Sequence, residues 1–252
     1  MNLTYGVLVA TRNRPESLAK LLDSLLLSSI QPTQIVIASS GNPITEVIRD
    51  FGRKLPITHL HIESKGQIRQ KMAGVKMLSP TLDWVAFLDD DLILAPNAIA
   101  NVFQTILNFS KNLNLVGVGF SASNWSPAPT TMLVRVVSTL FGVSTKRKGV
   151  VLRNGQNNNY MGSEYLIQTT WLNGASIWRK KNVDTYEFPF LNASYSVCED
   201  LIFSYKQSKE GILAYDPNSQ FAFQNEIPLS QLNSETYSAL TYWRMYLSLI
   251  HI

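Results

Sequence analysis

Three consecutive carboxylates, Asp89, Asp90 and Asp91, follow directly on the apolar run Trp84–Leu88. An apolar run of this length is typical of a strand that is buried on both faces of a sheet. Carboxylates at the end of such a strand repel one another, and a divalent cation would offset the repulsion because it binds carboxylate oxygens. Side chains alternate along an extended chain, so Asp89 and Asp91 could reach one ion while Asp90 points elsewhere. A solvated acidic turn would have the same sequence, so the rest of the chain has to decide between the two.

Two further segments contain residue types that are suited to catalysis. Glu199-Asp200 stands at the start of a predicted helix that ends at Gly211, where the helix dipole favours an ionised carboxylate. Such a carboxylate, held beside a substrate hydroxyl, can accept its proton. In Asn173-Gly174-Ala175, the missing side chain of Gly174 allows backbone and ligand to approach closely.

The first half of the chain alternates buried-strand patterns with amphipathic-helix patterns. This alternation predicts an α/β fold with a mainly parallel central sheet flanked by helices. Ligands of such sheets bind at the carboxyl ends of the strands. The predicted strands cover residues 5–10, 34–38, 57–62 and 84–88. The polar segments that end them, and that should share one rim, are Thr11-Arg12, Ser39-Ser40, Glu63–Lys65 and Asp89–Asp91.

The second half is less regular. Residues 132–143 form an apolar segment that Arg135 interrupts, and Lys146-Arg147-Lys148 follows it. This pattern indicates either an interfacial helix with a basic flank or a helix packed over an active site with a solvated basic loop. Residues 235–252 place aromatic and aliphatic side chains on one helical face, as in a docking helix, a membrane-surface helix or part of a longer element. The predicted strands are 113–120, 164–172, 175–178, 211–216 and 220–223.

Composition limits the possible classes of protein. The 252 residues are 45% hydrophobic and 16% charged, as expected for a globular protein. Cys198 is the only cysteine, so no intramolecular disulfide can form. A net charge of +4 suits an anionic small ligand or an anionic membrane surface and is too weak to indicate nucleic-acid binding. The sequence has neither a signal-peptide pattern nor an apolar run long enough to cross a membrane. We therefore expect a cytoplasmic protein, which could also contact the inner face of the membrane.

Five segments, in order, resemble those of the family 2 glycosyltransferases, which are inverting enzymes of GT-A fold with an Asp-x-Asp motif. The resemblance extends from about residue 5 to about residue 225. It implies a single GT-A-like domain over 1–252, with a Rossmann-like nucleotide-sugar-binding half (1–112), an acceptor and catalytic-base half (113–230) and a C-terminal helix (231–252). The segments are the opening strand and nucleotide loop (Val9–Leu18), the donor-binding helix (Lys65–Gly74), the Asp-x-Asp (Phe87–Leu92), the glycine-containing acceptor segment (Leu172–Ser176) and the Glu-Asp motif (Cys198–Phe203).

The resemblance also implies a reaction and roles for individual residues. A sugar would move from a nucleotide-sugar donor to a hydroxyl of a saccharide or lipid-linked acceptor, in surface polysaccharide or glycolipid biosynthesis. Mn²⁺ or Mg²⁺, bound by Asp91 and Asp89, would neutralise the leaving nucleoside diphosphate, and Asp200 would be the single general base, unlike the carboxylate pair of glycoside hydrolysis. The donor would contact Thr11, Arg12, Arg14, Ser39, Arg69, Asp89 and Asp90, and the acceptor side would comprise Asn173, Gly174, Ala175, Trp171 and Glu199.

The chain departs from the family pattern at three places. Ser39 stands where an Asp often holds the nucleotide base, and Met72 stands where an Asn is common. Gln224-Asn225 occupies the place of a His near the metal. Because of these differences, the sequence does not determine which nucleotide base the donor carries or which residue makes the third contact with the metal.

Three other functions are compatible with parts of this pattern. A metal-dependent nucleotidyltransferase would also use paired carboxylates, but it usually has a glycine-rich loop after the first strand, and Ala10–Pro15 contains no glycine. A degenerate, non-catalytic sugar- or nucleotide-binding member would not need Asp200. A dinucleotide-dependent dehydrogenase is disfavoured because no Gly-x-Gly-x-x-Gly follows the first strand. His59 and His61 alternate in a strand, and without a third ligand nearby they favour packing over a metal pair.

Overall fold

The computed structural model describes residues 3–110, 113–125, 131, 147–163, 167–187, 198–224, 241–242 and 244–248. The predicted apolar segment 132–143, Lys146 and most of the predicted C-terminal helix lie outside these ranges. Within the described part of the chain, no helix is both long and apolar enough to cross a membrane.

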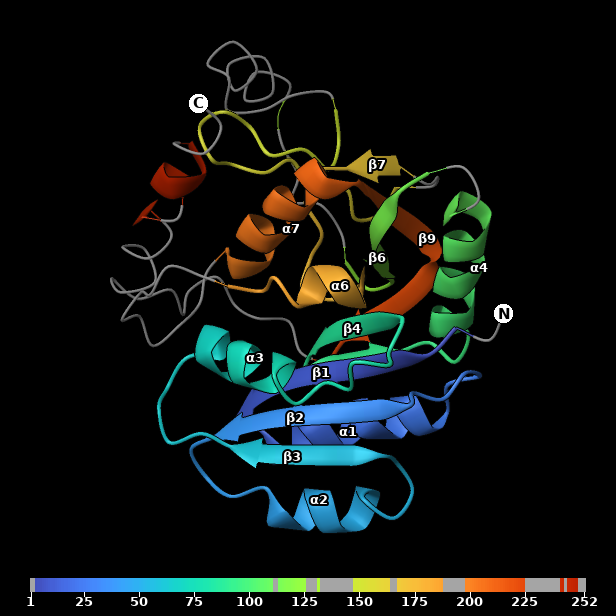
Figure 1. Cartoon of the computed structure of the whole chain (residues 1–252), viewed down its shortest axis with the longest axis vertical. Helices are drawn as coiled ribbons and strands as arrows, with labels where there is room; N and C mark the ends of the chain where they lie inside the picture. The colour runs from blue at the N-terminus through green and yellow to red at the C-terminus, as the bar shows by residue number, and fades with distance from the viewer. Residues whose placement is uncertain are drawn as a thin grey trace.

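The first half of the sheet is parallel, as predicted (Figure 1). It consists of β1 (Tyr5–Arg12), β2 (Gln34–Ser40), β3 (Ile57–His61) and β4 (Trp84–Asp89), in the order β3-β2-β1-β4. The strands pair in parallel, so their carboxyl ends meet at one edge. Asp89 is paired with Ala10, and the residues after both strands are therefore neighbours.

The second half of the sheet is mixed. The strand β8 (Ser176–Arg179) runs antiparallel to β4 and to β6 (Leu115–Ala122), so it joins the two halves. The long strand β9 (Ile212–Phe223) pairs in parallel with β6 and antiparallel with β5 (Leu92–Leu94) and β7 (Ile167–Thr169). The nine strands of the described residues belong to one sheet.

The prediction for the last strand of the sheet, β9, was wrong. The sequence predicted two short strands, 211–216 and 220–223, whereas β9 is continuous. Its register against β6 shifts so that Tyr215 pairs with Gly119 but Gln220 pairs with Ser121. The residues between Tyr215 and Gln220 form this irregularity. Because they are mostly polar, they interrupt the apolar pattern of the strand, and the sequence therefore predicted two strands.

Helices cover both faces of the sheet. The helices α1 (Pro15–Leu26) and α4 (Ala98–Ser110) pack on one face, where the predicted leucine stripe of α1 is buried. The helices α3 (Gln67–Val75) and α7 (Glu199–Glu210) pack on the other face, in front of the sheet in Figure 1. Two short helices are α2 (Thr45–Phe51) beside β3 and α6 (Lys180–Val183) after β8. The described residues 241–242 and 244–248 are helical as well.

Candidate functional site

The carboxylate cluster forms where β4 ends and the chain turns into β5. Thr11, near the end of β1, donates a hydrogen bond from Oγ1 to Asp90 Oδ2 at 2.7 Å. Arg14 Nη1 lies 3.1 Å from Asp90 Oδ1 and 3.4 Å from Asp91 Oδ2. Four of the predicted donor- or metal-binding residues therefore meet at this rim, and Asp90 is buried among them.

Asp89 faces a different set of partners, on the α3 side of the sheet. Its Oδ1 accepts a hydrogen bond from Gln67 Nε2 at 3.1 Å and lies 3.7 Å from Lys71 Nζ. Its Oδ2 faces Gly174, because a Cβ added there would lie only 2.1 Å from that oxygen. The acceptor-side segment thus lies directly against the end of β4.

Simple strand alternation does not describe the orientation of the three carboxylates. The strand ends at Asp89, and Asp90 and Asp91 lie in the turn that leads to β5. In this turn Asp90 and Asp91 share Arg14, whereas Asp89 points toward α3. The period of two applies only to extended backbone, and for that reason it does not extend beyond Asp89.

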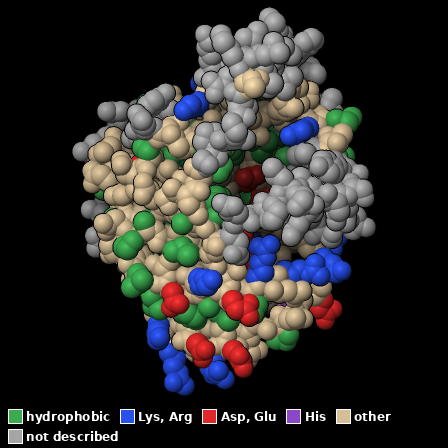
Figure 2. Space-filling model, turned by 180° about the vertical axis from the view of Figure 1, so that it is seen from behind, with side chains coloured by type: hydrophobic (Ala, Val, Ile, Leu, Met, Phe, Trp, Pro, Cys, Tyr) green, Lys and Arg blue, Asp and Glu red, His purple; other side chains and the backbone are tan. Residues whose placement is uncertain are grey.

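Burial and mutual repulsion raise the pKa values of two carboxyl groups in the cluster. Burial, followed by the carboxylates of Asp89 and Asp90, raises the pKa of Asp91 to about 6, with Arg14 opposing. Burial also raises the pKa of Asp90, although Thr11 and Arg14 oppose it. The cluster is open to solvent, since the side chains of Asp89 and Asp91 keep 35% and 18% of their surface exposed. Acidic side chains are visible in a hollow near the centre of the face drawn in Figure 2.

Lys71 connects this rim to the helix that carries Asp200. Its side chain is fully buried, and its ammonium group forms an ion pair with Glu199 Oε1 while lying 3.7 Å from Asp89. Tyr186 donates a hydrogen bond to the other carboxylate oxygen, Glu199 Oε2, at 3.0 Å. Burial lowers the pKa of Lys71, but Glu199 and Asp89 outweigh it and raise the pKa above its ordinary value. Lys71 therefore stays charged and joins elements from the two halves of the chain.

Asp200 is the second residue of α7. Its Oδ1 accepts a hydrogen bond from the backbone N–H of Leu201 at 2.8 Å. Burial, and next the adjacent Glu199 carboxylate, raise the pKa of Asp200 to about 7, whereas Lys71 opposes this shift. A carboxyl group with a pKa near neutrality is suited to exchange a proton with a substrate hydroxyl.

The end of β2 carries a small polar cluster of its own. Ser39 Oγ is 2.8 Å from His59 Nε2 and 3.1 Å from His61 Nδ1, both on β3. Gln70 of α3 donates hydrogen bonds to the carbonyls of Thr11 and Ala38, so it ties the ends of β1 and β2 together. Arg69 lies beside it on α3 and is half-buried.

Unpaired polar atoms gather at the same rim. Among the described residues, five buried side-chain atoms have no hydrogen-bond partner, and four of them belong to segments of this site. Such atoms are costly to bury, and a polar ligand would satisfy them. The four are Arg12 Nε, Ser40 Oγ, Asn173 Oδ1 and Gln224 Oε1.

The acceptor-side residues differ in how accessible they are. Trp171 is buried, its ring packs on Tyr160 with centroids 4.9 Å apart, and its Nε1 donates to Asn158 O at 3.1 Å. Glu199 is buried with Lys71 and Tyr186. Asn173 keeps an unpaired Oδ1, and Ala175 O accepts a hydrogen bond from the backbone of Phe120. Direct contacts of these residues with an acceptor stay predictions.

Comparison with known proteins identifies the family. The model of glycosyl transferase family 2 matches residues 6–163, which is more than half of the chain. The chain belongs to glycosyl transferase family 2. A Bacillus subtilis (strain 168) protein described as the uncharacterized glycosyltransferase YwdF is 27% identical over 105 residues, which cover 41% of this chain and 38% of that protein.

Solved structures show that this family 2 chain has the GT-A fold. The crystal structure of S. aureus TarS 1-349 in complex with UDP-GlcNAc matches with a TM-score of 0.62 and 15% identity, over 94% of this chain and 64% of that one. The UDP complex of the same protein matches with a TM-score of 0.61 and 14% identity, over 97% and 65%. The chain thus spans less than two thirds of the length of each of these relatives.

The residues at this rim include oxygen ligands of the kind that the metal implied by the family would need. No group of three His, Cys, Asp or Glu side chains that could hold an ion occurs in the described part of the chain. Asp89 and Asp91 nevertheless offer carboxylate oxygens, the donors that Mg²⁺ prefers. Gln224 donates from Nε2 to the carbonyls of Ser17 and Leu92, while its Oε1 is buried and unpaired. That amide oxygen is a neutral ligand available beside the cluster, and Asn225 lies outside the described residues.

The sequence analysis of this family 2 chain missed Lys71. It selected Arg69 of the same helix, although Lys71 is the residue that joins Asp89 to Glu199. Gly74 is the available signal, because a Cβ there would lie 2.4 Å from Leu8 Cδ1 of β1. A glycine in a helix that packs this closely on a sheet places the residues one turn earlier, Gln70 and Lys71, on the sheet side as well.

Proposed function

We propose that this chain is an inverting glycosyltransferase that moves a sugar from a nucleotide-sugar donor to a hydroxyl of a saccharide or lipid-linked acceptor. One observation carries the proposal. Lys71 contacts both Asp89, at the end of β4, and Glu199, at the start of α7. This buried contact joins the carboxylate rim to the helix that carries Asp200, so one substrate complex could reach both.

The donor would bind along the carboxyl ends of β1, β2 and β4. Arg12 Nε and Ser40 Oγ, unpaired in the structure, are suited to its phosphate and ribose oxygens. Arg14, with 49% of its side chain exposed, can move from Asp91 toward a diphosphate. Relatives support the donor class, since TarS binds UDP-GlcNAc and UDP. Ser39, bonded to His59 and His61, would face the nucleotide base.

The residues that would hold a divalent metal are Asp91 and Asp89, with Gln224 Oε1 as a neutral oxygen. When bound, the metal supplies positive charge to the leaving nucleoside diphosphate. Arg14 adds a permanent positive charge beside Asp90 and Asp91.

Asp200 would accept the proton of the attacking acceptor hydroxyl. Attack from the face opposite the leaving group inverts the anomeric centre in one displacement, so a single carboxylate base is sufficient. Lys71 and Tyr186 hold Glu199, the neighbour of Asp200, in a fixed position. This keeps the start of α7 rigid, which is what a correctly placed base requires.

The experiment is a panel of nucleotide sugars and candidate acceptors with Mn²⁺, in which the released nucleoside diphosphate is measured. Asp200→Asn should reduce turnover by about 10²–10⁴-fold while donor binding is kept, because the carboxylate acts only in proton transfer. Asp50→Asn, an exposed carboxylate on α2, is the matched control. Turnover that survives in Asp200→Asn would disprove the base assignment. Release of a sugar 1-phosphate, with transfer of the nucleoside monophosphate, would instead indicate a nucleotidyltransferase, and donor binding without turnover a non-catalytic member.

A further inference from the structure

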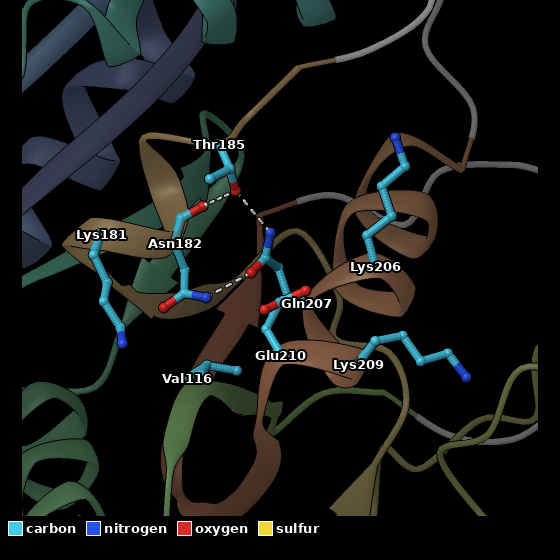
Figure 3. A pocket seen from close by; sticks show the side chains of 8 residues that line it. All are labelled: Val116, Lys181, Asn182, Thr185, Lys206, Gln207, Lys209 and Glu210. Carbon is cyan, nitrogen blue, oxygen red and sulfur yellow. Dashed lines mark hydrogen bonds between the residues drawn. The ribbon is translucent and has the colours of Figure 1, made fainter.

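A second polar cavity lies between α6 and α7, away from the carboxylate rim (Figure 3). Its volume is about 680 Å³, within the range of small-molecule sites. Its lining includes residues near the C-terminal end of α7, such as Gln207. Asp200 lies seven residues earlier on the same helix, a separation of about 10 Å.

The hydrogen bonds of this cavity leave one acceptor free. Thr185 Oγ1 donates its hydrogen to Asn182 O at 2.7 Å, so it must accept the 3.0 Å bond from Gln207 Nε2. Gln207 Oε1 is then the acceptor for Asn182 Nδ2 at 2.7 Å, which fixes the orientation of both amides. Asn182 Oδ1 remains, and it is the fifth unpaired buried atom of the described residues. Only 7% of the Asn182 surface is exposed, so this oxygen requires a donor inside the protein.

The rim of the cavity is positively charged. Lys181, Lys206 and Lys209 line it together with one acid, Glu210. Figure 3 shows the three lysine side chains pointing away from one another. Lys206 Nζ lies 5.8 Å from the centroid of the Tyr246 ring, and Lys209 Nζ lies 4.5 Å from that of Tyr205. Lysine stems are flexible, and an anion at the opening would draw these groups inward.

We propose that this cavity is a second ligand site, which binds a sugar monophosphate. The phosphate would lie at the lysine rim, where charge-assisted hydrogen bonds to ammonium groups are strong. A sugar hydroxyl would donate to Asn182 Oδ1, the free acceptor. None of these residues contacts the carboxylate cluster or Asp200 in a described interaction, so the site is separate from the proposed catalytic centre.

The test is calorimetric titration of the whole chain with glucose 6-phosphate, inorganic phosphate and glucose, at low salt. Glucose 6-phosphate should bind more tightly than phosphate, because only the ester also supplies a hydroxyl, and glucose should bind weakest. Lys206→Gln/Lys209→Gln should weaken the binding of glucose 6-phosphate by about tenfold or more. The matched control, Lys20→Gln/Lys54→Gln, removes the same charge from two exposed positions that do not line the cavity and should leave the affinity unchanged.

Three results would overturn the proposal. Glucose 6-phosphate could fail to bind, both double variants could lose affinity equally, or Arg14→Gln at the donor rim could lose affinity in place of the lysine variant. The titration needs no turnover, so its failure would leave the proposed glycosyl transfer untouched. Failure of glycosyl transfer would likewise leave this result intact.

Discussion

Gly174 lies so close to Asp89 that a Cβ at position 174 would be 2.1 Å from Asp89 Oδ2. The segment that carries Gly174 and the strand that ends in Asp89 are 85 residues apart in the sequence. Their contact places the predicted acceptor-side segment directly against the Asp89 carboxylate. Glycine is needed here for close approach, since its φ is not in the left-handed region.

Gly174→Ala should therefore displace the Asp89 carboxylate. Because a displacement of about 1 Å can cost about 10²-fold in rate, we expect turnover to fall by this order. The metal concentration for half-maximal rate should rise as well, as measured by Mn²⁺ titration. Gly6→Ala is the control, since its Cβ would meet Leu82 Cδ1 at 2.6 Å at the opposite end of β1. It should lower stability without changing the Mn²⁺ dependence, and equal Mn²⁺ curves for Gly174→Ala and the parent would contradict the account.

Lys71→Met should destabilise the protein strongly. It leaves the Glu199 carboxylate buried without a countercharge, and breaking such a pair costs about 3–5 kcal/mol of the free energy of unfolding. Urea denaturation measures this loss. Lys71→Met/Glu199→Gln removes both charges and should recover part of it. If the double variant were no more stable than Lys71→Met, the ion pair would not be the source of the effect.

Turnover should depend on pH through Asp200. Its pKa is raised to about 7, mainly by burial and by Glu199. A general base works only when deprotonated, so kcat/KM should be high above pH 7 and should fall tenfold per pH unit well below it. Lys71 lowers the pKa of Asp200, and Lys71→Arg, which keeps the charge, should leave this profile in place. A kcat/KM that is flat from pH 5 to pH 8, about two units below to one unit above this pKa, would exclude Asp200 as the base.

The sequence predicted the elements and the rim because both follow from local patterns. Apolar runs mark β1, β2 and β4 as buried strands, and parallel pairing brings their polar ends together. The role of Lys71 could not be predicted in this way. Its partner Glu199 is 128 residues away in the sequence. Helical periodicity indicates which side of α3 is buried, but it does not indicate which residues that side contacts.

The bond between Thr11 and Asp90 was missed for a related reason. The sequence placed both residues on one rim, but the orientation of Asp90 depends on the turn after Asp89, and alternation no longer applies there. The cavity between α6 and α7 was also not predicted. α6 has only four residues, too few to give a periodic signal.

The most direct test of the central claim is thermal unfolding of the chain with a panel of nucleotide sugars, with and without Mn²⁺. We predict that at least one donor at about 100 times its Kd raises Tm by about 5 °C or more, and only when Mn²⁺ is present. Asp89→Asn/Asp91→Asn should abolish this shift, because these carboxylates would hold the metal. An unchanged Tm with every donor, or a shift that persists in the double variant, would contradict a metal-dependent nucleotide-sugar site at the end of β4.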